Sequence, residues 1–224
     1  MVPVFPRWTW LWVLLLPVVA GSVNVTALLF LQHGGITHLT GVTTEAAAGI
    51  GRFDWALLAH AGVVVCLYCL GCAVSGYVHR LPRWVTSRRA AALLACEALF
   101  IAMVAGGGLS RLSSLACLAL AMGLQNGLTT VVSGALLRTT HLTGMFTDAA
   151  VAVGQSFAGV TWDRRRVMVC VTVIAGFVAG GILAGAGFGA AGLGILWLPA
   201  TMAGAVAAAT VGLSIRHTAQ VSDP

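Results

Sequence analysis

The chain has 224 residues, of which 59% are hydrophobic and 8% are charged, and its mean hydropathy is +0.97. Soluble domains carry about 25% charged residues, so a soluble enzyme is excluded. A disordered chain is excluded because disorder requires low hydrophobicity and high charge. The composition predicts an all-α polytopic membrane protein in which residues 1–224 form a single integral membrane domain.

Apolar runs predict six transmembrane helices, and the breaks between them contain Arg or Gly. The expected spans are 9–32, 56–78, 90–107, 113–137, 167–187 and 191–213. The first run follows Arg7 and resembles a signal peptide at its start. It is nevertheless long enough to cross a bilayer, so we expect it to be the first transmembrane helix.

Two further stretches, 33–51 and 139–157, are apolar but short, and Thr, His, Gly and an acidic residue interrupt both of them. Broken segments are tolerated at membrane depth only where they are buried in protein or line a cavity. We therefore expect both stretches to form re-entrant half-helices.

The distribution of Arg predicts the orientation of the chain. All twelve basic residues are Arg, and an excess of Arg in short loops marks the cytoplasmic side. With cytoplasmic N- and C-termini only Arg52 and Arg111 lie outside, whereas the opposite orientation inverts that ratio. The net charge of +6 follows from this topology, and no basic face with interleaved aromatic residues predicts binding to nucleic acid.

The two short stretches share a motif. The sequence THLTG occurs at 37–41 and again at 140–144. In each copy an acidic residue preceded by Thr follows the Gly, and an Asn precedes the His by 14 or 15 positions. The candidate site residues are Asn24, Thr37, His38, Thr40, Gly41, Thr44 and Glu45 in the first copy, and Gln125, Asn126, Arg138, Thr140, His141, Thr143, Gly144, Thr147 and Asp148 in the second.

Three predicted spans separate the two motifs, and an odd number means that the motifs enter the membrane from opposite faces. The sequence therefore predicts a 3+3 inverted-topology repeat, with repeat 1 at about 9–107 and repeat 2 at about 113–213. In transporters of this kind, broken helices meet near the midplane and form the binding site. The Arg count did not use the motif, and both lead to the same arrangement.

In a helical stretch the His and the acidic residue, seven positions apart, lie on one face. This applies to His38 with Glu45 and to His141 with Asp148. A charged group at the bilayer centre costs about 2.5–3.5 kcal/mol on insertion scales, so four such groups indicate a polar pathway or binding site. The alternative is structural: the Thr and His side chains fasten the half-helices to the Asn residues and to backbone carbonyls.

These features predict a small-solute membrane transporter, with the bilayer and a small polar solute or ion as its partners. Proton coupling through the His and acidic residues is a further expectation. The alternatives are a channel or facilitator for a polar or anionic solute, an intramembrane metal-dependent enzyme using both His residues, and a sensor that transports nothing. No activated nucleophile or metal-ligand spacing is present, so no cofactor or metal site is predicted. Arg138 is expected to be a cytoplasmic anchor, or a partner for Asp148 or for an anionic ligand.

Glycine spacing predicts close helix packing near the end of the chain. The residues Gly176, Gly180, Gly181, Gly185 and Gly189 have the small-xxx-small spacing of packed membrane helices, within one chain or in a homo-oligomer. A G-x-G-x-x-G sequence at 187–192 lacks a preceding strand and a following acidic residue until Asp223, so a dinucleotide site is excluded.

Several motifs together resemble a known family. They are the Asn in the first span, the first THLTG with its following Thr and acidic residue, and MGLQN at 122–126 followed by RTTHLTG at 138–144. This set is similar to the YoaK-like family of small bacterial inner-membrane proteins, and the second motif is the more specific one. The resemblance covers most of the chain. It implies a location in the bacterial cytoplasmic membrane, and it implies no substrate, reaction or catalytic residue.

Overall fold

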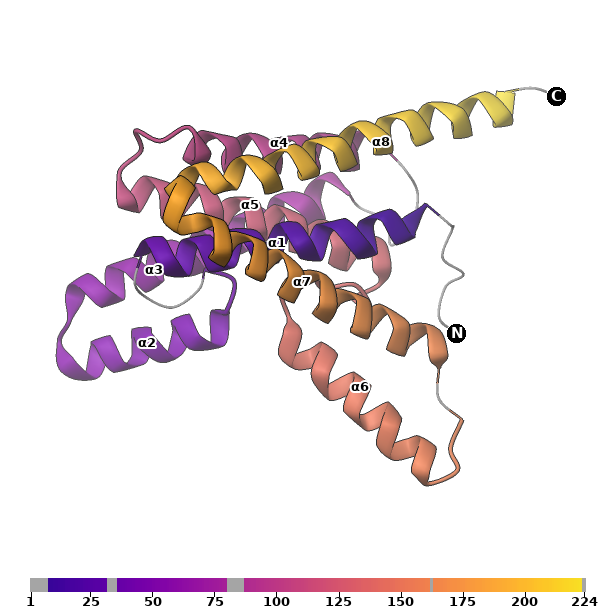
Figure 1. Ribbon diagram of the computed structural model, residues 1–224, viewed down its shortest axis with the longest axis horizontal. Coiled ribbons are helices and arrows are strands. Elements are labelled where there is room, and N and C mark those ends of the chain that lie inside the picture. The colour runs from indigo at the N-terminus through magenta and orange to yellow at the C-terminus, as the bar shows by residue number, and fades with distance from the viewer. Residues whose placement is uncertain (1–7, 32–35, 80–86, 162, 223–224) are drawn as a thin grey trace.

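The computed structural model describes residues 8–31, 36–79, 87–161 and 163–222, and within these ranges it contains helices and no strand. The elements in chain order are α1 (Thr9–Leu31), α2 (Leu39–Arg52), α3 (Trp55–Val78), α4 (Arg88–Ala105), α5 (Arg111–Ser133), α6 (Leu142–Phe157), α7 (Arg164–Ala191), the 3-10 helix η1 (Gly192–Leu196) and α8 (Trp197–Ser222). Long helices form an elongated bundle, and α2 and α6 project from one side of it (Figure 1).

Several helices are long and apolar enough to cross a membrane. The candidate spans are Thr9–Phe30, Trp55–Val78, Arg111–Ser133 and the 52-residue segment Arg164–Ile215, which includes α7, η1 and α8. Helix α4 has 18 residues, and it is not among these spans because Arg88, Arg89 and Glu97 add charge to it. The expected six spans correspond in position to α1, α3, α4, α5, α7 and α8, and the two short stretches correspond to α2 and α6.

Two helix ends differ from the sequence prediction. Helix α5 ends at Ser133 because Gly134 adopts a left-handed conformation with φ of 61° and caps the helix. Helix α7 continues past its expected end at residue 187 and ends at Ala191, where Gly192 has φ of 53°. Glycine accepts such positive φ values without steric penalty, so these two positions set where the helices stop.

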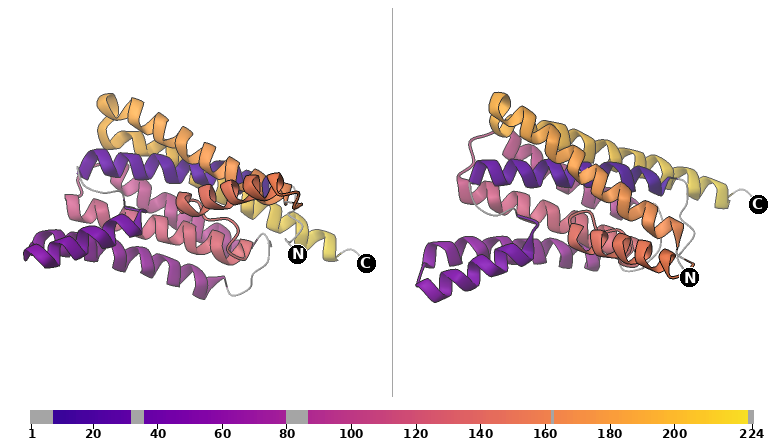
Figure 2. Two further views of the ribbon diagram at one scale, coloured as in Figure 1. Left: turned by 90° about the horizontal axis from the view of Figure 1, so that it is seen from below. Right: turned by 60° about the horizontal axis from the view of Figure 1, so that its bottom comes forward.

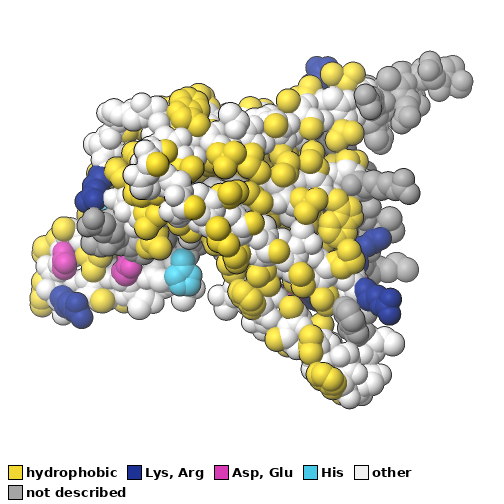
Figure 3. Space-filling view, in the orientation of Figure 1, with side chains coloured by type: hydrophobic (Ala, Val, Ile, Leu, Met, Phe, Trp, Pro, Cys, Tyr) yellow, Lys and Arg dark blue, Asp and Glu magenta, His cyan; other side chains and the backbone are white. Residues whose placement is uncertain are grey.

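Hydrophobic side chains fill the interior and also cover much of the outside. Leu16, Leu94 and Met122 are fully buried between the long helices. By contrast, Phe157 is 88% exposed and Ile182 is 64% exposed, and Figure 3 shows hydrophobic side chains spread across much of the visible face. Soluble proteins rarely expose such extended apolar surface, so the surface is that of a membrane protein.

The long helices of the first half of the chain pack mainly against long helices of the second half. Helix α1 packs against α7, α3 against α5, and α4 against α8 and α5, with smaller contacts of α1 with α8 and α5. The main packing contacts inside the first half are those of α2 with α3, and inside the second half those of α6 with α7 and of η1 with its neighbours. Figure 2 shows these long helices side by side in two further views.

Glycine allows α1 and α7 to approach closely. A Cβ atom added to Gly21 would overlap the carbonyl oxygen of Phe177, and one added to Gly180 would overlap the carbonyl oxygen of Val18. The two backbones therefore touch directly, as in membrane helix pairs with small residues at the interface. The expected packing role of Gly180 is confirmed within this chain.

Helices α3 and α5 approach in the same way. A Cβ atom added to Gly71 would overlap the carbonyl oxygen of Leu120, and one added to Gly123 would overlap the carbonyl oxygen of Tyr68. This second contact has glycine on both helices, like the first. Because no side chain separates the backbones, dispersion contacts and interhelical hydrogen bonds hold the pair together.

A serine hydrogen bond accompanies each glycine contact. The Ser22 hydroxyl of α1 donates to the carbonyl oxygen of Gly180 at 3.0 Å, and the Ser75 hydroxyl of α3 donates to the carbonyl oxygen of Leu124 at 2.7 Å. Both hydroxyl groups are buried. Each bond fixes how far the two helices can slide along one another.

Helices α2 and α6 are too short to cross a bilayer. With 14 and 16 residues they are about 21 and 24 Å long, whereas a hydrocarbon core is about 30 Å thick. Each packs on the helix that follows it, α2 on α3 and α6 on α7. In Figure 1, α2 begins near the middle of the bundle and runs to the left edge, and α6 begins near the middle and runs to the lower right.

Candidate functional site

Asn24 of α1 fixes the start of α2. Its amide oxygen accepts hydrogen bonds from the backbone N–H and the hydroxyl of Thr37, at 3.2 and 2.8 Å. Thr37 is 6% exposed, so both bonds are sheltered from bulk water. They hold the segment before α2 against α1 and position the first THLTG motif.

Asn126 of α5 positions the second THLTG motif in the same way. Its amide oxygen accepts a hydrogen bond from the Thr139 hydroxyl at 3.2 Å, and Gln125 Nε2 donates to the same hydroxyl oxygen at 2.6 Å. Gln125 Nε2 also donates to the carbonyl oxygen of Leu16 at 3.0 Å, which ties α5 to α1. Asn and Thr are thus 13 positions apart in both halves.

Thr139 was not among the predicted site residues. The motif aligns Thr37 with Thr140, and this alignment gives unequal distances to the preceding Asn. Counting from the Asn instead identifies Thr37 and Thr139 as equivalent partners. The Thr-to-Asn hydrogen bonds that the structural alternative expects are present, with Thr139 in place of Thr140.

His38 and His141 are the N-cap residues of α2 and α6. Their backbone angles are nearly equal, with φ of −89° and ψ of 69° at His38 and φ of −91° and ψ of 61° at His141. Neither imidazole makes a capping hydrogen bond, and neither helix has an acidic residue in its first turn. The first backbone N–H groups of an α-helix have no partner inside the helix, so both helix ends can donate to a ligand.

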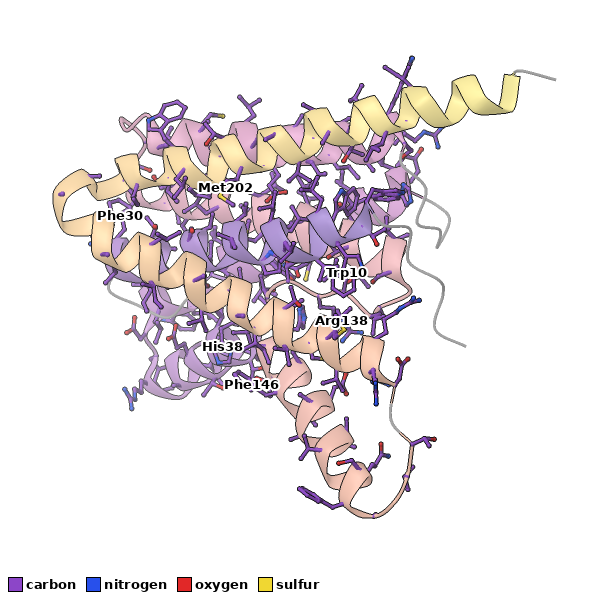
Figure 4. All side chains as sticks on the ribbon, turned by 45° about the vertical axis from the view of Figure 1, so that its right-hand side comes forward. Trp10, Phe30, His38, Arg138, Phe146 and Met202 are labelled. Atoms are coloured by element: carbon purple, nitrogen blue, oxygen red, sulfur yellow. The ribbon has the colours of Figure 1, made fainter. Side chains whose placement is uncertain are left out.

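The two THLTG motifs line one cavity of about 390 Å³. Its walls are residues 37–40 from the first motif and 140–144 from the second, together with Asn24, Arg138 and Phe177. In Figure 4 the side chain of His38 lies between α2 and α6, and Arg138 lies on the other side of α6's first turn. Segments about 100 residues apart in sequence thus form a single site, with polar groups set among apolar ones such as Leu39, Leu142 and Phe177.

The two acidic residues of the motifs lie outside this cavity. Asp148 pairs with Arg166 of α7, with Arg166 Nη2 3.0 Å from Asp148 Oδ2. Glu45 is half-buried and is not part of the cavity wall. Arg138, for which Asp148 was one expected partner, lines the cavity instead.

The remaining candidate residues support the helices around the cavity. The Thr44 hydroxyl donates to the carbonyl oxygen of Thr40, and the Thr147 hydroxyl donates to that of Thr143, both at 2.8 Å. Both Thr side chains are exposed and neither lines the cavity. Gly41 lies against the His38 ring, where a Cβ atom would overlap the imidazole.

Phe177 and Tyr68 are two further residues at the site that the sequence did not predict. Phe177 of α7 lines the cavity, and the Tyr68 hydroxyl of α3 lies beside the Thr140 hydroxyl. No motif marks either residue. Both carry a carbonyl group that a glycine of the neighbouring helix contacts, and this relationship is visible only in three dimensions.

Among the described residues, no three His, Cys, Asp or Glu side chains lie close enough together to hold a metal ion. The polar groups of the cavity wall are Arg138, two imidazoles, Thr hydroxyls, the Asn24 amide and the backbone N–H groups of two helix ends. Such groups bind and orient a polar or negatively charged molecule.

Comparison with known protein families identifies a match over most of the chain. No curated protein and no solved structure matches the chain significantly. A family model described as "Protein of unknown function (DUF1275)" matches residues 12–209, which include both THLTG motifs and all of the cavity wall. The YoaK-like resemblance is consistent with that match. The chain belongs to the DUF1275 family.

Proposed function

We propose that this protein is a transport protein for a small solute, and that the cavity between the starts of α2 and α6 is its binding site. The observation that carries this proposal is the convergence of both THLTG motifs on one cavity of about 390 Å³. This volume lies near the lower end of ligand pockets, which are about 300–1,000 Å³. It suits a small solute.

The proposal includes an inverted repeat, with α1–α4 as one unit and α5–α8 as the other. Its strongest support is the correspondence between the two glycine contacts. Gly21 and Val18 of α1 have Gly123 and Leu120 of α5 as counterparts, 102 positions later, and their contact partners Phe177 and Gly180 lie 109 positions after Tyr68 and Gly71. Each contact of one pair therefore has an equivalent in the other.

Opposite orientation of the two units is part of the same proposal. In Figure 1, α1 runs from right to left and α5 from left to right, and α2 and α6 leave the cavity toward opposite ends of the bundle. In transporters built from inverted repeats, broken helices meet near the midplane and present their ends to the solute. We propose that α1, α3, α4, α5, α7 and α8 cross a bacterial inner membrane, with cytoplasmic termini.

We assign proton coupling, within this proposal, to His38 and His141. Both line the cavity, and His is the side chain that titrates near neutral pH. Glu45 and Asp148 lie outside the cavity, and Asp148 is paired with Arg166, so they are not proposed as proton carriers.

Flux measurements with matched variants test the proposal. Purified protein in liposomes is offered neutral, cationic and anionic small solutes, and uptake is compared among four Trp variants. Thr40→Trp and Thr143→Trp place a large ring in the cavity wall, whereas Thr44→Trp and Thr147→Trp change exposed residues one turn further along the same helices. We expect at least tenfold lower flux in the first two variants and near-normal flux in the other two.

Two results would contradict transport through the cavity. One is the absence of flux for every solute class from folded protein, and the other is equal flux in all four variants. Large single-channel currents would assign the protein to the channels instead of the alternating-access transporters.

A further inference from the structure

We infer that the cavity takes a small oxyanion or carboxylate. This inference names the substrate class of the proposed transport site and rests on the proposed function for the role of the cavity. It depends on three independent features of the cavity: its charge, its two helix ends, and a buried hydroxyl group.

The cavity has a cationic side chain and no anionic one. Arg138 lines it, and neither of the two nearby acidic residues does. Within the described part of the chain, Arg138 has no carboxylate partner, and Asp148 is neutralised by Arg166. A cation entering the cavity would be repelled by Arg138, and a neutral solute would leave its charge without a partner.

The N-terminal ends of α2 and α6 add positive potential to the same space. A helix N-terminus is equivalent to about half a positive charge and is a ready site for anions. Here residues 39 and 40 of α2 and 142–144 of α6 form part of the cavity wall, and no His side chain caps either end. Both ends are free to donate backbone hydrogen bonds to one molecule.

The third feature of the cavity is the buried hydroxyl group of Thr140. Thr140 is 8% exposed and lines the cavity, and its hydroxyl oxygen has no hydrogen-bond partner of good geometry. The Tyr68 hydroxyl beside it is close enough to interact with the Thr140 oxygen as a donor, which leaves the Thr140 proton for another acceptor. Buried polar groups are almost always hydrogen-bonded, so the Thr140 hydroxyl is a donor that an oxygen atom of a bound ligand satisfies.

The arrangement of these donors selects the kind of anion. Arg138, Thr140 and the two helix ends surround the cavity from different elements, so a ligand with several acceptor oxygens uses more of them than a single-centre halide. Arginine also pairs well with carboxylates and oxyanions through two parallel N–H groups. A small carboxylate or oxyanion therefore matches both the charge and the donor geometry.

Binding to the detergent-solubilised protein tests the inference separately from transport. Formate, acetate, nitrate and phosphate are compared with chloride, ammonium and urea at fixed ionic strength, by calorimetric titration and by the rise in unfolding temperature that a native-state ligand causes. We expect at least one of the four oxygen-containing anions to bind more tightly than chloride, and ammonium and urea to give no binding.

Three variants locate the binding. Arg138→Gln should weaken anion affinity at least tenfold, and Thr140→Val should weaken it severalfold. Arg52→Gln, which changes an exposed Arg at the far end of α2, should leave it unchanged. Arg138→Lys, which keeps the charge, should retain part of the affinity and serves as the informative variant where Arg138→Gln does not fold.

The outcomes separate the inference from the proposed function. Equal anion affinity in Arg138→Gln and the unaltered protein, or binding of ammonium or urea alone, would overturn the inference. Flux of a neutral solute without anion binding would leave the transport proposal intact and refute the substrate class. Anion binding that depends on Arg138 without any flux would support the ligand class and refute transport.

Discussion

The amide oxygen of Asn24 accepts two hydrogen bonds from Thr37, one from its backbone N–H at 3.2 Å and one from its hydroxyl at 2.8 Å. This pair links a long helix to the start of a short one. The Asn126–Thr139 bond repeats the link in the second half. Both THLTG motifs are thus held in place by an amide oxygen from the preceding long helix.

Replacing Asn24 by Leu should destabilise the protein by about 1–3 kcal/mol, because the Thr37 donors lose their acceptor in a buried site. Solute binding in the cavity should weaken as well, since the start of α2 is no longer fixed. Thermal unfolding in detergent and a binding titration measure the two effects. Thr44→Val, which removes a bond inside α2 only, is the control, and equal behaviour of the two variants would contradict the positioning role.

Gly180→Ala should destabilise the protein by about 1–3 kcal/mol, because the added methyl group would overlap the Val18 carbonyl and force α1 and α7 apart. Gly189→Ala on the same helix meets no atom within 4 Å and should be neutral. On α3 the matched pair is Gly71→Ala and Gly62→Ala. Unfolding temperatures of the four variants check the prediction. An equal change in unfolding temperature in all four variants would refute it.

Glu97→Leu should leave stability unchanged or raise it. Glu97 is fully buried in α4, and both carboxyl oxygens lack a hydrogen-bond partner, so an apolar side chain of similar size removes an unsatisfied polar group. Chemical unfolding of Glu97→Leu and Glu97→Gln measures this. A loss of flux at unchanged stability would instead give Glu97 a part in transport.

Asp148→Asn should retain most of its stability and its flux. The ion pair with Arg166 is solvent-accessible, with side chains 37% and 53% exposed, and such pairs contribute about 0–1 kcal/mol. His141→Asn should reduce pH-driven uptake because it changes a cavity-lining residue. The assay is uptake into liposomes with and without a pH gradient. Lower pH-driven uptake in Asp148→Asn than in His141→Asn would indicate that the carboxylate, and not the imidazole, carries the proton.

Reporter fusions at residues 53 and 159 should report opposite sides of the membrane. Residue 53 follows α2 and residue 159 follows α6, and the proposed inverted repeat puts these two turns on different faces. An alkaline phosphatase and a fluorescent protein fused at each position give complementary signals. Fusions that report the same side would contradict the inverted arrangement.

The sequence predicted the order of long and short helices because Thr, His, Gly and an acidic residue interrupt the two short stretches. These stretches form helices of 14 and 16 residues, whereas the other six α-helices in the described part of the chain have 18–28 residues. The sequence did not predict where the acidic residues lie relative to the cavity. His38 and His141 take non-helical backbone angles, so each helix begins one residue later than the seven-residue stripe assumed. Both His residues line the cavity, and the two acidic residues do not.

Other features were not predicted from the sequence. The repeated motif pairs Thr37 with Thr140, and the hydrogen bonds show that the equal 13-residue spacing from Asn to Thr37 and to Thr139 was the relevant signal. Phe177 enters the cavity wall because α7 crosses α1 at glycine contacts. Such crossings depend on which helices become neighbours, and helix spacing patterns do not encode that choice.

The exchange of helix partners between α1–α4 and α5–α8 has a consequence for how the chain can be divided. Since α1, α3 and α4 find their main long-helix neighbours only in α5, α7 and α8, neither segment has an interior of its own. If the two segments were expressed separately, each would expose its glycine contact surfaces to lipid. Co-expression of both segments would be required to restore the native fold.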